Sequence, residues 1–359
     1  MSRFRWALLG LAGLVAFAGL PAHVTLARSL LDDAPVRILL VGDSVTQGSA
    51  GDWTWRYRLW QHLRDTGTAV DLVGPRNDVY DFNVPAFGSQ AYADPRFDRD
   101  HAARWGMTFS GQDVPIQQLV RRYRPDVVVE MLGLNDLVME HRRPRLVIRS
   151  ARAFVRDARA ADPDVDVVLA ELPQTWDTGV QVYDDALGAL ARSLSTHASR
   201  VVTARPLDPF VQRVDTWDPA HPSASGEVKI AAGVSDALAG LGIGRPYPRV
   251  LPAVPDVPRT PPSLRVLPGD RQAILVWVRP PGATGEYVWV RDASREEPWS
   301  RLPYPVAGSR FVDTGLVNGH TYDFRVQATK GWIIPADVIS PVVAVVPVRP
   351  SGSSPVGPR

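Results

Sequence analysis

The stretch VRILLVGDSVTQG (residues 36–48) places an apolar run directly before a polar, glycine-punctuated loop. Residues 36–41 have the composition of a buried strand, and the run stops at Gly42, Asp43 and Ser44. A turn alone would account for the glycine and the aspartate. The serine needs a further reason, and a nucleophile presented at the end of a strand supplies one. The rest of the chain has to decide between these two interpretations.

Four more apolar runs follow, at residues 70–73, 126–132, 165–172 and 200–204. The stretches between them have the amphipathic pattern of helices. Alternating strands and helices predict an α/β fold, with a parallel sheet covered by helices on both faces. Functional sites in such sheets form at the carboxyl ends of the strands. Ser44, Asn135 and the loop after Ala204 all fall at these ends.

The composition excludes several classes of function. The chain has 359 residues, a net charge of +2 and no cysteine. The small net charge argues against a nucleic-acid partner. The absence of cysteine excludes disulfides, thiolate metal sites and a cysteine nucleophile. No histidine pair has the spacing of metal ligands, so we expect no metal. Arginine (38 residues) far outnumbers lysine (Lys229 and Lys330), which we attribute to a GC-rich genome.

The N-terminus has the pattern of a secretory signal peptide. Arg3 and Arg5 precede an apolar run over residues 6–20, and small residues follow, with a plausible cleavage site at residues 25–27. The run is short for a membrane span, although an uncleaved signal anchor is the alternative. Both possibilities place the rest of the chain outside the cytoplasm, so we expect a secreted protein with a signal peptide over residues 1–27. We expect no stable membrane span after cleavage.

The character of the chain changes after residue 244. Residues 245–262 contain seven prolines and predict a semi-stiff linker. Residues 263–348 hold short strand patterns separated by Gly and Pro turns, which predict a small β-sandwich. Residues 349–359 have the composition of a disordered tail. We therefore expect the first domain, residues 34–244, to fold and work alone.

Three blocks in the first domain resemble those of the SGNH/GDSL hydrolase family. GDSVTQG (42–48) matches the nucleophile block, GLND (133–136) the oxyanion-hole block and DPAHPSASG (218–226) the D-x-x-H block. The resemblance implies Ser44 as nucleophile, His221 as base, Asp218 as its partner and Asn135 as an oxyanion donor. It also implies a flavodoxin-like three-layer sandwich with a five-stranded parallel sheet, and no cofactor.

A fourth block concerns the glycine of the oxyanion hole. DHAARWGMT (100–108) resembles a block of the acetyl xylan esterase-like branch of carbohydrate esterases, which points to Gly106. Gly111 is the alternative. The resemblance implies that this glycine, the backbone N–H of Ser44 and the Asn135 side chain hold the negative oxygen of the tetrahedral intermediate.

A second D-x-x-H pattern, at Asp98 and His101, competes for the role of base. It lies before the central strand rather than after the last one, so we expect His101 to be structural or to face the substrate. The tryptophans of the first domain could line a sugar site or pack in the core. They are Trp53, Trp55 and Trp60.

The predicted sandwich resembles a fibronectin type III domain over residues 263–348. GLVNGHTYDFRVQA (315–328) matches its E–F region, with Tyr322 at the tyrosine corner and Trp277 as the core tryptophan. Such modules accompany secreted bacterial enzymes that degrade polysaccharides. A spacer or stability role is the default, and polysaccharide or cell-wall contact is the alternative. The aromatic candidates for such contact are Trp289, Trp299 and Trp332.

Together these patterns predict a secreted serine esterase that hydrolyses acetyl or other short acyl esters, with an acylated carbohydrate as substrate. An esterase or lipase acting on lipids or small esters is one alternative, and an acyltransferase is another. A wall- or matrix-binding protein with an inactive hydrolase domain is the non-enzymatic alternative.

Overall fold

The computed structural model describes residues 34–349 except residue 208. The predicted signal peptide lies outside the described residues, as does all of the predicted tail beyond residue 349. In the described part of the chain, no helix combines the length and the apolar character that crossing a membrane requires.

A parallel sheet forms the centre of the first part of the chain. Its five main strands lie in the order β2 (Val70–Val73), β1 (Val36–Gly42), β6 (Val127–Met131), β7 (Asp166–Ala170) and β8 (Val201–Ala204). A two-residue strand, β5 (Ala102–Ala103), pairs with the end of β1. The order corresponds to the flavodoxin-like arrangement 2-1-3-4-5. The predicted α/β fold and its five strands are therefore confirmed.

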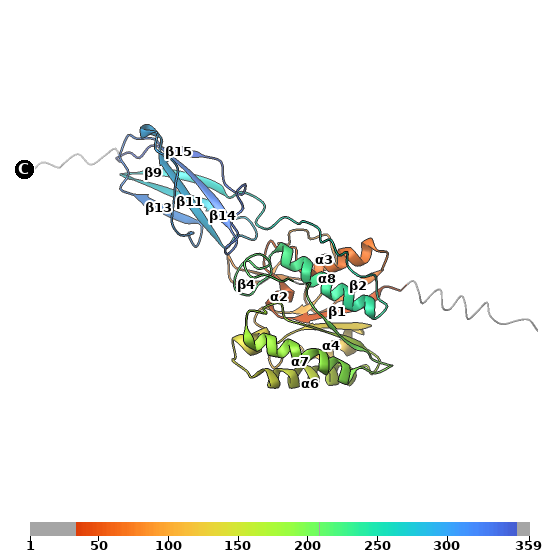
Figure 1. The fold of residues 1–359 in the computed structure, drawn as a ribbon. Helices are drawn as coiled ribbons and strands as arrows, with labels where there is room; N and C mark the ends of the chain where they lie inside the picture. Colours follow the sequence, from red (N-terminus) through yellow and green to blue (C-terminus); the bar gives the residue numbers. More distant parts are fainter. Residues whose placement is uncertain (1–33, 208, 350–359) are drawn as a thin grey trace, which may run out of the picture. The chain divides into compact units, whose positions relative to one another are not determined.

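Helices cover both faces of this sheet (Figure 1). One face carries α3 (Trp55–Asp65) and α8 (Ala224–Gly240), which pack on each other. The opposite face carries α4 (Ile116–Tyr123), α6 (Pro144–Arg159) and α7 (Thr178–Leu194). Because apolar helices lie on both sides, the central strands β6 and β7 are buried at every residue.

Short elements shape the edge where the parallel strands end. Two short helices, α2 (Ser44–Gln47) and α5 (Leu134–Val138), follow β1 and β6. A hairpin of β3 (Val79–Asp81) and β4 (Ala86–Ser89) follows β2. The sequence did not predict this hairpin.

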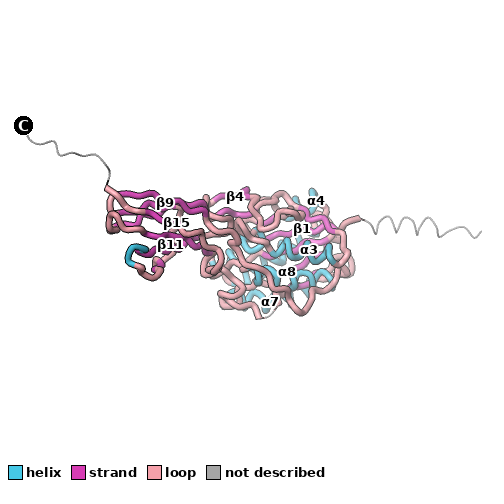
Figure 2. The backbone as a smooth tube through the Cα atoms, turned by 90° about the horizontal axis from the view of Figure 1, so that it is seen from above, coloured by secondary structure: helices cyan, strands magenta, loops and turns pink. Residues whose placement is uncertain are grey.

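The C-terminal sandwich, β9 to β15, consists of two antiparallel sheets. One has the order β13 (Arg310–Thr314), β10 (Gln272–Val278) and β9 (Ser263–Gly269). The other has β12 (Ser300–Arg301), β11 (Gly285–Asp292), β14 (Tyr322–Thr329) and β15 (Val343–Val345). Figure 2 shows this part as strands and loops with one short helical turn, η1 (Ala293–Arg295).

The sandwich has its own core, with Trp277 and Phe324 buried between the sheets. The Tyr322 hydroxyl accepts a hydrogen bond of 3.1 Å from the Val317 N–H. This is the tyrosine-corner contact that the sequence predicted.

The proline-rich segment 245–262 packs against the α/β region, β1 to α8, rather than running free. Tyr247 and Val257 are buried in it. The Tyr247 N–H donates to Asp236 at 3.0 Å, and the Trp53 indole N–H donates to the Pro255 carbonyl at 3.2 Å. The described residues from Val36 onward form one compact unit. The domain bounds drawn from the sequence stay predictions.

Candidate active site

A tight strand-to-helix turn presents Ser44. Asp43 caps α2 by accepting a hydrogen bond of 2.9 Å from the Val45 N–H, and Ser44 is the first residue of that helix. A Cβ at Gly42 would lie 2.2 Å from the Thr46 hydroxyl oxygen, so only glycine fits at the end of β1. The sequence GDS is therefore needed here for shape as well as for chemistry.

Ser44, His221 and Asp218 form a continuous hydrogen-bonded chain. The His221 Nε2 lies 2.9 Å from the Ser44 Oγ, and its Nδ1 lies 2.7 Å from an oxygen of Asp218. The other Asp218 oxygen accepts from the backbone N–H groups of Ala220 and His221, at 2.8 and 2.7 Å. The structure thus brings together the three residues predicted as the nucleophile, its base and the partner of the base.

The charge state of Asp218 suits a partner of histidine. Burial raises the pKa of this carboxyl, but the hydrogen bonds and positive charge of His221 outweigh burial and leave the pKa below its ordinary value. An ionised Asp218 accepts the Nδ1 hydrogen and leaves Nε2 free to take the serine proton.

A buried aspartate fixes the loop that carries the base. Asp215 accepts hydrogen bonds of 2.7 Å from both the Val211 N–H and the Lys229 ammonium. The loop then closes on itself, because the Trp217 N–H donates to the His221 carbonyl at 3.0 Å.

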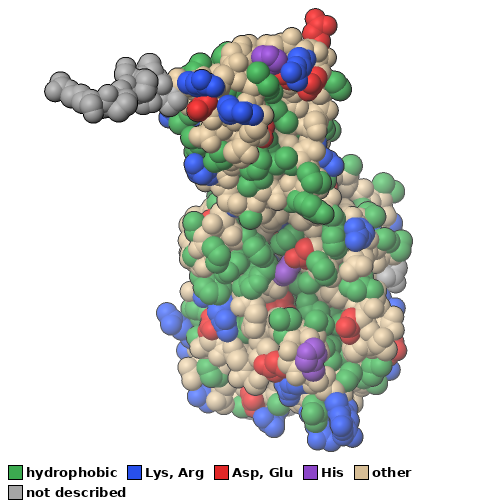
Figure 3. All heavy atoms as spheres, turned by 90° about the vertical axis from the view of Figure 1, so that its left-hand side faces the viewer, with side chains coloured by type: hydrophobic (Ala, Val, Ile, Leu, Met, Phe, Trp, Pro, Cys, Tyr) green, Lys and Arg blue, Asp and Glu red, His purple; other side chains and the backbone are tan. Residues whose placement is uncertain are grey.

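Two tryptophan rings stack with the His221 imidazole. The Trp105 ring centroid lies 4.2 Å from the imidazole centroid with 24° between the planes, and the Trp217 centroid lies 5.1 Å away with 19°. The edge of Phe82, from the β3–β4 hairpin, contacts both indoles. These rings restrict the imidazole to the plane in which it reaches Ser44. Figure 3 shows a face on which hydrophobic side chains gather around a histidine.

Two backbone donors are available for an oxyanion. Within the described residues, neither the Ser44 N–H nor the Gly106 N–H donates a hydrogen bond to the protein. Gly106 has a φ of 76° and lines the same cavity as Ser44 and His221. The Gly111 N–H, in contrast, already donates to Thr108, and Gly111 does not line this cavity. The geometry favours Gly106 over Gly111.

The Asn135 amide lies beside these donors and already makes two hydrogen bonds within the protein. Its Nδ2 lies 3.1 Å from an oxygen of Asp43 and 3.1 Å from the Met107 carbonyl. Asn135 lines the same cavity as Ser44 and Gly106. An oxyanion would share one of the two N–H groups with its present acceptor.

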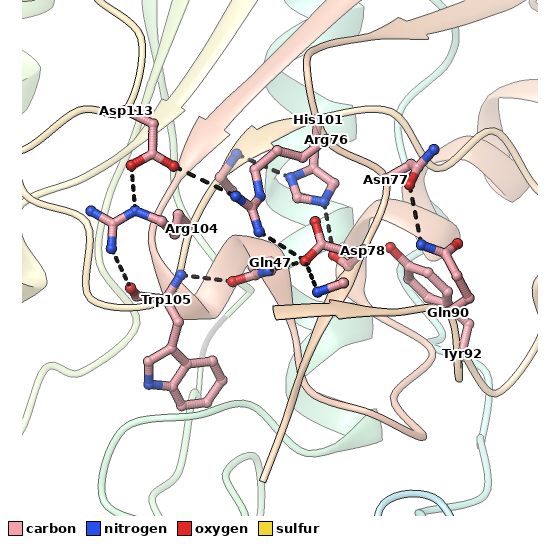
Figure 4. A network of polar contacts seen from close by, with 12 residues as sticks. Gln47, Arg76, Asn77, Asp78, Gln90, Tyr92, His101, Arg104, Trp105 and Asp113 are labelled. Atoms are coloured by element: carbon pink, nitrogen blue, oxygen red, sulfur yellow. Dashed lines mark hydrogen bonds and ion pairs between the residues drawn. The ribbon is translucent and has the colours of Figure 1, made fainter. Parts of the chain in front are cut away.

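A polar network that the sequence did not predict holds the Gly106 loop (Figure 4). The Gln47 side-chain oxygen accepts a hydrogen bond of 2.7 Å from the Trp105 N–H, and its amide nitrogen donates to Asp78 at 3.1 Å. Asp78 also accepts from Arg76 at 2.8 Å. Among the described residues, Gln47 is the acceptor for the Trp105 N–H, and its place in GDSVTQG was the available signal.

Buried acids lie beneath the nucleophile. Burial raises the pKa of Asp43 to about 7. Burial also raises the pKa of Glu130, on β6, well above its ordinary value, and that of Asp136, on α5. Asp136 accepts a hydrogen bond of 3.1 Å from the Phe109 N–H and so anchors the end of the loop that contains Gly106.

A cavity of about 620 Å³ opens at the triad. Ser44, Gly106, Asn135 and His221 form one wall. Much of the remaining surface is apolar and comes from Trp105, Leu134, Val138, Met139, Trp176, Pro219 and Ala220. Polar groups also reach it, from Thr108, Glu140, Gln174 and Asp177.

The competing D-x-x-H pattern is structural. His101 is fully buried; its Nδ1 accepts from the Ala103 N–H at 3.0 Å, so its Nε2 donates to the Asp78 carbonyl at 2.9 Å. Burial and the charge of Arg56 hold the pKa of His101 well below its ordinary value. Asp98 accepts from the Leu72 N–H at 2.6 Å.

The tryptophans of the 53–60 stretch do not reach the cavity either. Trp55 is buried in the α/β core, and Trp53 and Trp60 pack with Tyr57. In the described ranges, no cluster of His, Asp and Glu has the arrangement of a metal site.

A serine, a histidine and an aspartate in this relation, at the end of a parallel strand, have the arrangement of a serine hydrolase site. The model of the GDSL-like lipase/acylhydrolase family matches residues 40–228, which is more than half of the chain. The chain belongs to this family and is an ester-hydrolysing enzyme.

Solved structures resemble parts of the chain. A family 3 carbohydrate esterase from Talaromyces cellulolyticus is 28% identical, with a TM-score of 0.49 over 57% of this chain and 97% of its own. A family 3 carbohydrate esterase from Clostridium thermocellum is 22% identical, with a TM-score of 0.48 over 58% and 97%. The fn3 domain of the human collagen alpha-1(XX) chain is 24% identical, with a TM-score of 0.22 over 27% and 92%. No curated protein matches the chain.

Proposed function

We propose that this enzyme hydrolyses short acyl esters carried by a carbohydrate, through an acyl-enzyme on Ser44. The observation that carries the proposal is the chain of contacts from Asp218 through His221 to Ser44, at 2.7 and 2.9 Å, at the mouth of the cavity. Family membership supports ester hydrolysis. The carbohydrate part rests on the resemblance of the Gly106 block and on the lining of the cavity.

The mechanism follows from the positions of these groups. His221 Nε2 takes the Ser44 proton as Oγ attacks the ester carbonyl carbon. The N–H groups of Ser44 and Gly106, with the Asn135 amide, bind the resulting oxyanion. His221 then protonates the departing alcohol as the C–O bond breaks. Water, deprotonated by His221, attacks the acyl-enzyme and releases the carboxylic acid.

The cavity lining suits a sugar. Trp176 is 37% exposed and offers an aromatic face against which the C–H groups of a sugar ring can pack. Glu140, Asp177 and Gln174 supply acceptors and a donor for hydroxyl groups. Acyl groups larger than acetyl are the second candidate, because Val138 and the 71% exposed Met139 extend the apolar wall.

A substrate panel tests the proposal. It contains acetylated xylan, acetylated monosaccharides and p-nitrophenyl esters from acetate to octanoate, with free sugars added to detect acyl transfer. We expect the highest kcat/KM for acetylated sugars. A maximum at the long p-nitrophenyl esters would favour a lipid esterase, and acylated acceptor sugars would favour a transferase.

A matched pair of variants tests the sugar contact. Trp176→Ala should raise KM for an acetylated sugar and leave KM for p-nitrophenyl acetate unchanged. Trp289→Ala, in the sandwich, is the control and should change neither. Equal effects of Trp176→Ala on both substrates would argue against sugar stacking.

We further propose that the enzyme acts outside the cytoplasm, on the basis of the signal-peptide pattern in residues 1–27. N-terminal sequencing of the mature protein from culture medium should begin after residue 27. Polysaccharide contact by the sandwich is a separate proposal that rests on Trp299. Binding of the full chain to insoluble polysaccharide, with and without Trp299→Ala, tests it.

A further inference from the structure

A lysine of the C-terminal sandwich is buried in the α/β region. The Lys330 side chain is 1% exposed, and its ammonium forms an ion pair with Asp52. It also donates to the Ser49 hydroxyl at 2.8 Å. Asp52 is held in turn by the Ser49 N–H at 2.7 Å. A buried charge is tolerated only where partners of this kind compensate it.

The Lys330 ammonium also approaches Trp217, which is the neighbour of Asp218 in the chain. Its Nζ lies 5.0 Å from the centroid of the Trp217 ring, which stacks with His221. Trp217 directly precedes Asp218 in the chain. Lys330 is therefore one side chain away from the base of the triad.

Two further residues of the sandwich bond to the backbone of the His221 loop. The Trp332 N–H donates to the Trp217 carbonyl at 3.0 Å, and the Trp332 indole N–H donates to the Thr216 carbonyl at 2.5 Å. Both acceptors lie in the segment that immediately precedes Asp218, so the sandwich determines where these two peptides sit.

The fit between these segments leaves no room for side chains. A Cβ at Gly331, whose φ is 52°, would lie 1.7 Å from the Trp217 carbonyl oxygen. At a second point of contact, a Cβ at Gly51 would lie 2.4 Å from the Gly282 nitrogen. Backbone meets backbone at both places, which is the packing of an interior rather than of two modules joined by a flexible linker.

We propose that the segment 330–332 of the sandwich positions the catalytic loop, with Lys330 and Trp332 as positioning residues for His221 and Asp218. The sandwich is then a working part of the ester-hydrolysing site, and the expectation that residues 34–244 work alone is replaced. The proposal rests on the hydrolase site itself and not on the identity of the substrate.

A matched pair of single substitutions in the full chain tests the proposal. Trp332→Phe removes the indole N–H that reaches the Thr216 carbonyl, and Trp289→Phe removes the equivalent N–H that bonds to Gln327 within the sandwich at 3.1 Å. Trp332→Phe should lower kcat on p-nitrophenyl acetate by about threefold to tenfold, the range of one lost hydrogen bond, with KM unchanged. Trp289→Phe should leave kcat unchanged.

Two readouts do not depend on the substrate. The rate of Ser44 labelling by a fluorophosphonate should fall with Trp332→Phe by the same factor as kcat. Hydrogen exchange of the amides in residues 215–223 should become faster in Trp332→Phe and not in Trp289→Phe. Unchanged kcat, labelling and exchange in Trp332→Phe, or equal losses in both variants, would overturn the proposal. If these differences in kcat, labelling and exchange are found but the full chain does not hydrolyse acetylated sugars, only the proposed substrate is contradicted.

Lys330→Met provides an independent check. It leaves Asp52 buried without its cation, so the melting temperature and kcat should both fall. The double variant Lys330→Met/Asp52→Asn removes both charges and should recover part of the melting temperature without recovering kcat. Full recovery of kcat in the double variant would show that Lys330 acts only through stability and would contradict its positioning role.

Discussion

The side-chain oxygen of Gln47 accepts a hydrogen bond of 2.7 Å from the backbone N–H of Trp105, the residue directly before Gly106. Gln47 lies three residues after Ser44. One short segment therefore carries the proposed nucleophile and contacts the residue next to the proposed oxyanion donor. This relationship leads to the first prediction.

Gln47→Met should lower kcat by about tenfold while KM changes little, because a loosened Gly106 weakens a contact that matters only in the transition state. Gln90→Met is the matched control, since it also removes two hydrogen bonds of a side-chain amide, one donated to Asn77 at 3.1 Å and one accepted from Arg99 at 2.6 Å. Steady-state kinetics on p-nitrophenyl acetate checks both variants. A change in KM alone for Gln47→Met would assign Gln47 to substrate binding.

Ser44→Ala should abolish ester hydrolysis and fluorophosphonate labelling, because it removes the hydroxyl that lies within hydrogen-bond distance of His221. Ser193→Ala, on α7, removes a hydroxyl that donates to the Leu190 carbonyl at 2.7 Å, away from the cavity, and should retain full activity. Mass spectrometry of the labelled protein locates the adduct. Persistent labelling in Ser44→Ala would remove Ser44 from the mechanism.

The two histidines should respond differently to substitution. His221→Ala should lower kcat by roughly 10⁴-fold, because Ser44 loses its base. His101→Ala should lower the melting temperature, because the fully buried ring bonds to Asp78 and Ala103, and the folded fraction should keep its kcat. Kinetics normalised to labelled Ser44 separates the two effects. A larger loss of kcat in His101→Ala would reverse the assignment of the base.

Asn135→Ala should lower kcat by about 10²- to 10³-fold with little change in KM, as the loss of a preorganised oxyanion donor does. The comparison of kcat with KM on one small ester checks this. If Asn135 serves only to hold the Met107 and Asp43 contacts, the loss will be smaller and a lower melting temperature will accompany it.

Asp184 should make stability depend on pH. Burial raises the pKa of this carboxyl from 3.8 to about 8. The folded protein therefore keeps a proton between about pH 4 and pH 8 that the unfolded chain releases, and the contribution to stability is lost as the pH rises through this window. Asp184→Asn removes this dependence, so its free energy of unfolding relative to the natural chain should rise from pH 4 to pH 8. Urea denaturation at several pH values measures this difference, and a constant difference would contradict the raised pKa.

The sequence predicted the sheet and the triad because both are local patterns. The apolar runs of β1, β6 and β7 are continuous, and the GDS and D-x-x-H blocks are short and fixed in spacing. It did not predict the β3–β4 hairpin, whose strands are too short to show a period. Nor did it predict contacts made by side chains far apart in the chain, such as Gln47 with Trp105 or Lys330 with Asp52. In the sequence, Lys330 stood out only because lysine is rare, and rarity does not indicate which residue the lysine contacts.

In the described part of this enzyme, almost no lysine side chain is accessible to chemical modification. Its two lysines are both engaged: the Lys229 side chain is 17% exposed and paired with Asp215, and the Lys330 side chain is 1% exposed and paired with Asp52. Amine-reactive dyes and aldehyde-activated resins will find few targets there. A reagent strong enough to acylate Lys330 would have to open the contact beside the triad first. Immobilisation of the enzyme for use on polymers is better directed to the exposed arginines or carboxylates, which leave that contact intact.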